Sequence, residues 1–124
     1  MATRSMIGIM DKDGMGASLI YCHWDGYPDG VGADLKEFYG TEEKARALLE
    51  LGDISSLRET LENTVAYHRD RGEELNPTRY CANRKEIFTR ADHCGAEYVY
   101  LFHADLAQWE CLVVTRSGLR EWAE

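Results

Sequence analysis

The alternation of apolar and polar residues near the two ends of the chain predicts two β-hairpins. In the first, residues 4–10 and 17–23 are strand-like and flank a turn at 11–14, whose Asp-Gly pair tolerates positive φ. In the second, residues 97–103 and 109–115 are rich in aromatic and β-branched residues, and a short connection joins them. The pattern therefore predicts antiparallel strand pairs at both ends of the chain.

Successive side chains of the second strand point to opposite faces of the sheet. Cys22 points to the same face as Ile20, whereas His23 points to the opposite face at the end of the strand. We therefore assign Cys22 to the core and His23 to a candidate site.

Between the hairpins, apolar residues recur at helical spacing. Thr41 is a predicted N-cap and Gly52 a predicted C-terminal stop. Leu57, Leu61 and Val65 continue with helical spacing beyond that stop. The segments that we predict to be helices are 31–39, 41–51, 83–93 and a short one at 117–124.

The order of two strands, several helices and two strands predicts an α+β fold, with an antiparallel sheet built from the N-terminal and C-terminal β-hairpins and helices packed on one face. A length of 124 residues without linker or repeat predicts a single compact α+β domain, 1–124. Residues 67–77 are polar and charged and end in Asn-Pro, which predicts a long surface loop. Such loops inside compact domains are mostly functional or mobile.

The charge balance narrows the classes of partner. Fourteen basic and 22 acidic residues give a net charge of −8. A general nucleic-acid binder neutralises phosphates with Lys and Arg, so we expect no general nucleic-acid binding. The balance fits a basic protein partner or a small anionic ligand held by a local basic site. Six basic residues do cluster in one segment: Arg69, Arg71, Arg79, Arg84, Lys85 and Arg90.

Membrane and redox signals are weak in this sequence. No apolar run approaches the ~18 residues of a membrane span, and residues 1–5 lead into a strand without a signal-peptide core, so we expect a cytoplasmic protein without membrane contact. The four cysteines form no C-x-x-C pair, and we expect no disulfide and no cofactor. A zinc site on Cys81, His93 and Cys94 is an alternative whose spacing matches no standard zinc finger.

The first group of candidate functional residues lies in the loop 21–32, where the second strand runs into glycine and proline. His23, Trp24, Asp25 and Tyr27 enter this turn. Loops held by rigid elements commonly carry binding groups. The structural alternative is that the aromatic side chains cover the end of the sheet and the aspartate forms the turn.

The second group lies in the polar segment that follows residue 66 and consists of Tyr67, His68, Arg69 and Arg71. Aromatic faces combined with Arg guanidinium groups are suited to a nucleobase and its phosphate. The alternative is that Tyr67 caps a helix while the arginines pair with neighbouring glutamates in solvent.

Two His-x-Asp triplets raise a catalytic alternative. If His23 and Asp25 converge with His68 and Asp70, the four side chains could hold a divalent metal and activate water. We expect a binding protein rather than an enzyme, because short pairings of common polar residues are weak signals.

Three segments resemble a family of small proteins from phages and prophages. They read Ile20-Tyr-Cys-His-Trp-Asp-Gly-Tyr-Pro28 followed by Val31-Gly32, Leu51-Gly-Asp-Ile-Ser-Ser-Leu57, and Ala66-Tyr-His-Arg-Asp-Arg-Gly-Glu73. The resemblance extends in the same order over about residues 4–103. It brings no settled activity, but implies that the two candidate segments meet in one site and that the protein is an accessory factor acting against host defence.

These observations lead us to expect a non-enzymatic binding protein in the host cell cytoplasm that sequesters a small nucleotide or cyclic-nucleotide signal. The aromatic side chains would stack, the basic ones would meet phosphate, and Asp25 would accept from ribose or base. One alternative is an acidic, anti-CRISPR-like inhibitor of a host defence protein; another is a metal-dependent phosphodiesterase. A homo-oligomer with a ligand site between subunits is also possible for a binding protein of this kind. The expected ligand-binding residues, with none catalytic or metal-binding, are His23, Trp24, Asp25, Tyr27, Tyr67, His68, Arg69 and Arg71.

Overall fold

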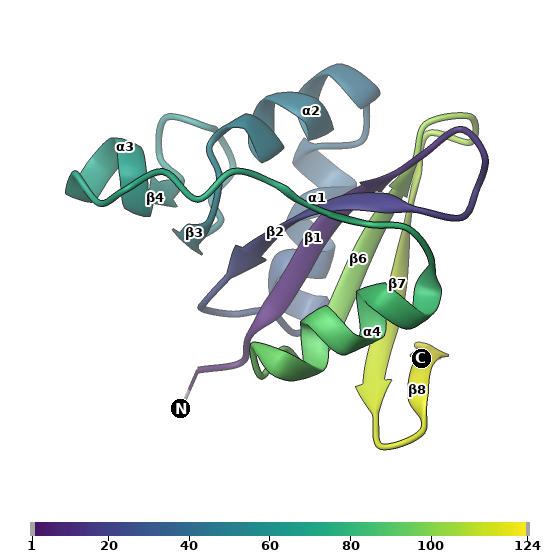
Figure 1. Ribbon diagram of the computed structural model, residues 1–124. Helices are drawn as coiled ribbons and strands as arrows, with labels where there is room; N and C mark the ends of the chain where they lie inside the picture. The colour runs from purple at the N-terminus through teal and green to yellow at the C-terminus, as the bar shows by residue number, and fades with distance from the viewer. Residues whose placement is uncertain (1, 124) are drawn as a thin grey trace.

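The computed structural model describes residues 2–123 and has an α+β architecture, in which strand pairs at both ends of the chain flank helices and short strands (Figure 1). The strands within this range are β1 (Ser5–Met10), β2 (Ala17–Cys22), β3 (Ile54–Ser56), β4 (Val65–Ala66), β5 (Arg79–Cys81), β6 (Tyr98–His103), β7 (Gln108–Thr115) and β8 (Gly118–Glu121). The helices are the π-helical turn η1 (Pro28–Gly32), then α1 (Ala33–Phe38), α2 (Glu42–Glu50), α3 (Tyr67–Arg71) and α4 (Arg84–His93).

Both predicted hairpins are confirmed. β1 pairs antiparallel with β2, and β6 pairs antiparallel with β7. The predicted helix ends are confirmed as well, because the Thr41 hydroxyl accepts from the Lys44 amide at 3.3 Å and Gly52 has a φ of +74°. A β-carbon at that positive φ would be strained, which explains why glycine ends α2.

The sheet is mixed, so the prediction of a purely antiparallel sheet is wrong in part. Its strand order is β4-β3-β2-β1-β6-β7-β8, and β5 pairs with β2 beside β3. The pairs β1–β6 and β2–β3 are parallel, whereas the others are antiparallel. The two hairpins meet through β1 and β6, which run in the same direction because the chain between them returns to the end of the sheet where β1 begins.

Helices cover both faces of the sheet, which corrects the prediction that they pack on one face. α1 and α2 lie behind the sheet and α4 lies in front of it (Figure 1). Leu35 and Leu48 pack with Ile20 in one core, and Ile87 packs with Leu19 in the other. All six residues of β1 are buried, and a strand buried on both faces needs cover on both.

Three further segments differ from prediction. The helical spacing of Leu57, Leu61 and Val65 does not form a helix, because the Thr64 hydroxyl bonds the Arg58 amide (3.0 Å) and the Thr60 carbonyl (2.9 Å) and closes a turn before β4.

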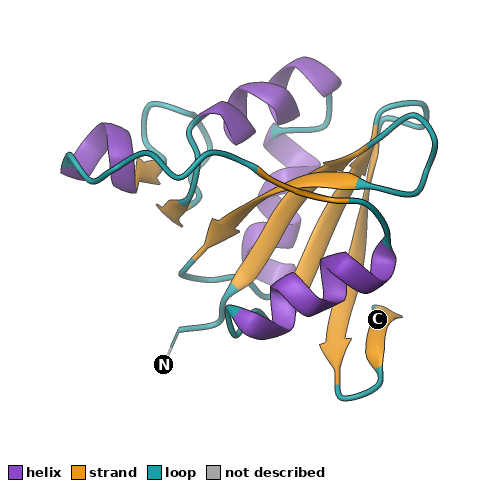
Figure 2. Cartoon of the chain, viewed as in Figure 1, coloured by secondary structure: helices purple, strands orange, loops and turns teal. Residues whose placement is uncertain are grey.

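The chain end also forms a strand where a helix was predicted, because β8 pairs with β7; the last residue of that predicted helix, 124, lies outside the described residues. Residues 67–77, predicted as loop, begin with the helix α3 and continue as a loop into β5 (Figure 2). Within residues 2–123, every helix is too short and too polar to cross a bilayer.

Candidate functional site

The start of the loop 21–32 is fixed to the sheet by main-chain hydrogen bonds. The His23 amide donates to the Ile54 carbonyl at 3.2 Å, and the Trp24 amide donates to the Ser55 carbonyl at 3.0 Å. These bonds continue the pairing of β2 with β3 beyond the end of β2. The side chains of His23 and Trp24 therefore project from a backbone that the sheet holds in place.

The middle of the loop is anchored at Gly26. Its amide donates to the Thr3 carbonyl at 2.8 Å, and its carbonyl accepts from the buried Tyr100 hydroxyl at 2.7 Å. A β-carbon at this position would lie 2.8 Å from both the Thr3 oxygen and the Ser5 β-carbon, so only glycine fits. Burial raises the pKa of Tyr100 far above its usual value, so its hydroxyl stays a hydrogen-bond donor.

Asp25 and Tyr27 shape the turn itself. Asp25 has a φ of +57°, and its carbonyl accepts from the Val31 amide at 2.9 Å. Its carboxylate accepts from the Tyr27 hydroxyl at 3.3 Å, and its negative charge raises the pKa of that phenol. The aspartate is thus a turn former in this structure, and its predicted contact with a ribose or base stays a prediction.

Aromatic side chains line up from the end of β2 into the loop. The Tyr21 hydroxyl lies 2.8 Å from the His23 Nδ1 atom. The His23 and Trp24 rings meet edge to face, with centroids 4.7 Å apart and planes at 89°. Trp24 nevertheless remains 43% exposed. This places a large flat ring at the surface, positioned by its neighbours and open to a ligand.

The second candidate segment begins at α3, which directly follows β4. The Tyr67 amide donates to the carbonyl of Asp53, the residue before β3, at 3.3 Å, and this bond fixes the start of the helix. The Arg71 guanidinium lies 5.2 Å from the centroid of the Tyr67 ring, which is a cation–π distance. Arg71 Nη2 also donates to the Ser55 hydroxyl at 3.4 Å. An aromatic ring and a guanidinium group are therefore stacked on this helix.

Ser55 joins the two candidate segments. Its carbonyl accepts from the Trp24 amide at 3.0 Å, and its hydroxyl accepts from Arg71 at 3.4 Å. The residue is buried in β3, between the loop 21–32 and α3. We call this junction the edge site; it consists of Tyr21, His23, Trp24, Ser55, Tyr67 and Arg71.

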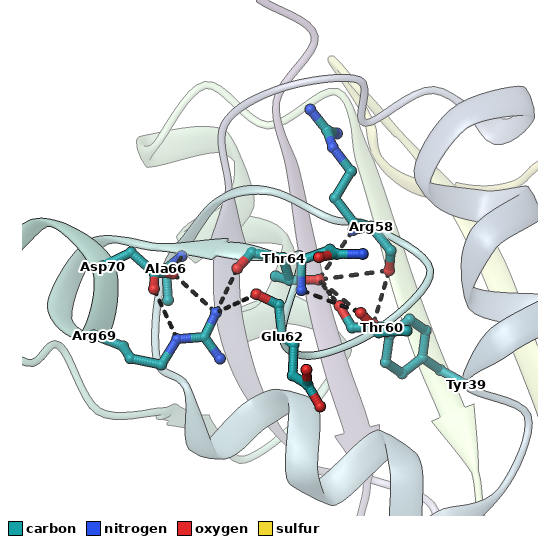
Figure 3. Close-up of polar contacts among 9 residues, drawn as sticks. Tyr39, Arg58, Thr60, Glu62, Thr64, Ala66, Arg69 and Asp70 are labelled. Atoms are coloured by element: carbon teal, nitrogen blue, oxygen red, sulfur yellow. Dashed lines mark hydrogen bonds and ion pairs between the residues drawn. The ribbon is translucent and has the colours of Figure 1, made fainter.

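Arg69 has a different environment from Arg71 (Figure 3). Its Nε and Nη2 atoms donate to the Asp70 carboxylate, each at 2.9 Å, and Nη2 also donates to the Thr64 and Glu62 carbonyls. Asp70 in turn accepts from the Ala66 amide at 2.8 Å. These contacts tie α3 to the turn that precedes β4. Arg69 thus stabilises the segment, and its predicted contact with phosphate stays a prediction.

His68 is the second residue of α3, and its side chain reaches the turn that follows the helix. Its Nδ1 atom is 2.8 Å from the Glu73 carbonyl oxygen, and the Glu73 amide donates to the Tyr67 carbonyl at 3.1 Å. Gly72 ends the helix with a φ of +67°. His68 is exposed and supports this turn, and its predicted role in ligand binding is untested.

The Arg69–Asp70 contact gives a pH prediction. The hydrogen bond from Arg69, with a second from the Ala66 amide, lowers the pKa of Asp70 below its ordinary value of 3.8. A depressed pKa means that the pair stabilises the fold above pH 3.8 and loses this contribution as the pH falls through the lower folded-state value. A carbon-13 NMR titration of the Asp70 carboxyl should have its midpoint below 3.8, and Arg69→Gln should raise it. A midpoint at or above 3.8 in the parent protein would contradict this assignment.

An ion pair between the buried Asp53 and the partly exposed Arg79 lies next to the edge site, and no sequence pattern predicted it. β5 pairs with the first half of β2, and β3 pairs with the end of β2. The Tyr21 amide lies between these two paired regions. The Asp53 carboxylate accepts this amide at 2.9 Å and receives Arg79 at 2.9 and 2.7 Å. The signal available in the sequence was the Leu51–Leu57 motif, whose polar residue Asp53 makes these contacts.

Metal and thiol chemistry find little support at this junction. In residues 2–123, no three His, Cys, Asp or Glu side chains are grouped to hold a metal ion. The two His-x-Asp triplets are thus not brought together as a metal centre within the described part of the chain. Burial raises the pKa of the Cys22 thiol to about 12, which leaves it without nucleophilic thiolate at neutral pH.

Two surface cavities within residues 2–123 are lined by none of the eight predicted ligand-binding residues. The larger, about 630 Å³, lies at the opposite end of β2 from the edge site. The smaller, about 380 Å³, lies between Tyr80 and α4. The larger cavity is therefore separate from the edge site.

Among known proteins, no family model, no curated protein and no solved structure matches this chain.

Proposed function

We propose that the protein binds a small anionic ligand of the nucleotide class at the edge site. The single observation that carries this proposal is the double contact of Ser55. Its carbonyl holds the backbone of the exposed Trp24 and its hydroxyl holds the guanidinium of Arg71. A stacking surface and a forked cation are thus anchored on one buried residue, a combination suited to a base and its phosphate.

The electrostatic surroundings favour Arg71 as the phosphate contact. Arg69, Arg79 and Arg84 each form an ion pair with a carboxylate. In the part of the chain that the structure describes, the contacts of Arg71 are with neutral groups, the Ser55 hydroxyl and the Tyr67 ring. Its positive charge is therefore available to an anion, in a protein whose net charge is −8.

The resemblance to phage and prophage proteins adds a biological context to this proposal. A small accessory protein that binds without reacting would act by lowering the concentration of a free nucleotide signal. We therefore propose sequestration of a nucleotide or cyclic nucleotide from a host defence system as the role of this site. Its chemistry requires recognition of the ligand and no bond cleavage.

Thermal unfolding in the presence of nucleotides tests the proposal. A nucleotide at a hundredfold excess over its dissociation constant should stabilise the protein by about 2.7 kcal/mol. The parent nucleoside and inorganic phosphate should each have a smaller effect at the same concentration, because each contacts only part of the edge site. The absence of stabilisation across mononucleotides, dinucleotides and cyclic nucleotides would refute the proposed function.

A further inference from the structure

We propose that the larger cavity is a second ligand site, for a small molecule that combines an apolar ring system with a protonated amine. The cavity, about 630 Å³, lies between the turn after β1, the helix α2, the turn after β6 and residues 75–78. Figure 1 shows the turns of the two hairpins beside each other near α2. Its volume is within the range of about 300–1,000 Å³ typical of small-molecule sites.

The floor of the cavity is apolar. Ile9, Met10 and Leu49 are almost fully buried and line it from β1 and α2. Leu75 lines it from the segment that follows α3, although 44% of this leucine remains exposed. An exposed leucine over buried apolar side chains is unfavourable in water, and an apolar ring in the cavity would cover it.

The rim of the cavity is acidic. It carries four carboxylates, from Asp11, Glu42, Glu50 and Asp105, and two cations, from Lys12 and Arg46. Arg46 is paired with Glu42 at 2.7 Å, so it neutralises one carboxylate. Lys12 offsets another, which leaves a net charge of −2 around the opening. This charge favours a cation and disfavours a phosphate or carboxylate.

His103 contributes an oriented polar group to the lining. Its Nε2 atom lies 2.9 Å from Glu110 Oε1, and Arg84 donates to the same oxygen at 2.8 Å. The Glu110 carboxylate, which is paired with Arg84, therefore fixes the orientation of the imidazole. A few fixed polar groups around an apolar floor are typical of sites that orient a small ligand.

This inference does not depend on the function proposed for the edge site. The two sites lie at opposite ends of β2, share none of their residues, and prefer ligands of opposite charge. A nucleotide bound at one and an amine bound at the other would give separate sets of perturbed NMR signals.

Three indole compounds of similar size test the cavity: tryptamine, tryptophol and indole-3-propionate, which carry a positive charge, no charge and a negative charge. Each is titrated into the protein and followed by amide and methyl NMR. We expect tryptamine to shift the signals of Ile9, Met10, Leu49 and Leu75 and to bind at least about tenfold more tightly than indole-3-propionate, with tryptophol between them. Equal affinity for the amine and the acid, signal changes elsewhere, or no binding of tryptamine would overturn the proposal.

A matched pair of variants on α2 tests the charge of the rim. Glu50 lines the cavity, whereas Glu43 is on the same helix and does not. Both side chains are exposed, so neither change should disturb folding. Glu50→Gln should weaken tryptamine binding by about fivefold, and Glu43→Gln should leave it unchanged. Equal effects of the two variants would show that only the overall charge matters and would contradict a site at this cavity.

Discussion

Replacing Asp53 with alanine is expected to lower the free energy of unfolding by about 3 kcal/mol, at the low end of the range for breaking a buried ion pair. Asp53 is only 7% exposed and accepts the Tyr21 amide and both terminal nitrogens of Arg79. Its loss would leave a guanidinium and a backbone amide without their partner at the point where β3 and β5 diverge along β2. Arg79 is partly exposed, so solvent limits the cost.

Urea unfolding followed by tryptophan fluorescence measures this effect, and an exposed pair on α2 supplies the control. Glu42 and Arg46 form an ion pair at a similar distance, but both side chains are about half exposed. Glu42→Ala should therefore change the free energy of unfolding by less than about 1 kcal/mol. If both alanine variants have the same effect, Asp53 has no special structural role.

Two further variants separate charge from packing at the same position. Asp53→Asn keeps an acceptor for the Tyr21 amide but removes the charge, so it should be less damaging than alanine. In the double variant Asp53→Ala/Arg79→Met no unpaired guanidinium is left, and its destabilisation should be smaller than the sum of the single effects. An additive result would show that the two side chains act independently.

Removal of the Trp24 or Arg71 side chain is expected to abolish most nucleotide binding with little loss of stability. Base stacking on an aromatic ring contributes about 1–3 kcal/mol, so Trp24→Ala should weaken affinity by about 5- to 150-fold. Arg71→Gln should have a comparable effect, because charge-assisted bonds to phosphate are among the stronger hydrogen bonds. Both side chains are exposed, so their removal leaves the core intact.

Matched controls are available elsewhere on the surface. Tyr80 is an exposed aromatic residue on β5, and Arg116 is an exposed arginine between β7 and β8. Tyr80→Ala and Arg116→Gln should leave nucleotide affinity unchanged in isothermal titration calorimetry. Equal losses in the control and site variants would indicate a nonspecific effect of charge or surface, and unchanged affinity in both site variants would place the ligand elsewhere.

Local patterns predicted the parts of the fold that depend on neighbouring residues. The two hairpins, the cap at Thr41 and the stop at Gly52 all follow from short stretches of sequence. The parallel pairing of β1 with β6 joins residues more than 90 positions apart, and no local pattern encodes it. The second layer of helices follows from the complete burial of β1, which only the assembled sheet reveals.

Propensity was misleading where tertiary contacts dominate. Leu57, Leu61 and Val65 have helical spacing, yet the hydroxyl of Thr64 closes a turn between two short strands. The last residues have an apolar pattern compatible with a helix, but they form β8, which pairs antiparallel with the edge of β7. In this pairing, Arg120 lies opposite Val113. In both places, hydrogen-bond partners decide the conformation rather than the spacing of apolar residues.

The candidate site was predictable in its composition and less so in its geometry. Trp24 and Arg71 could be chosen from residue chemistry alone, because aromatic rings and guanidinium groups are suited to nucleotides. The residue that joins them, Ser55, is an ordinary serine in a short strand, and only the pairing of β2 with β3 reveals its position. Likewise, Arg69 and Arg71 are equivalent in sequence terms, and only their contacts distinguish them.

An amide chemical-shift map tests whether a nucleotide binds at the edge site. The protein is titrated with the nucleotide that gives the largest thermal stabilisation, and the perturbed signals are placed on the structure. We predict that the largest changes fall on Trp24, Ser55, Tyr67 and Arg71 together, with His103 at the larger cavity unaffected. Changes confined to one of the two segments, or centred on the cavity, would contradict a single nucleotide site at the junction of the loop 21–32 and α3.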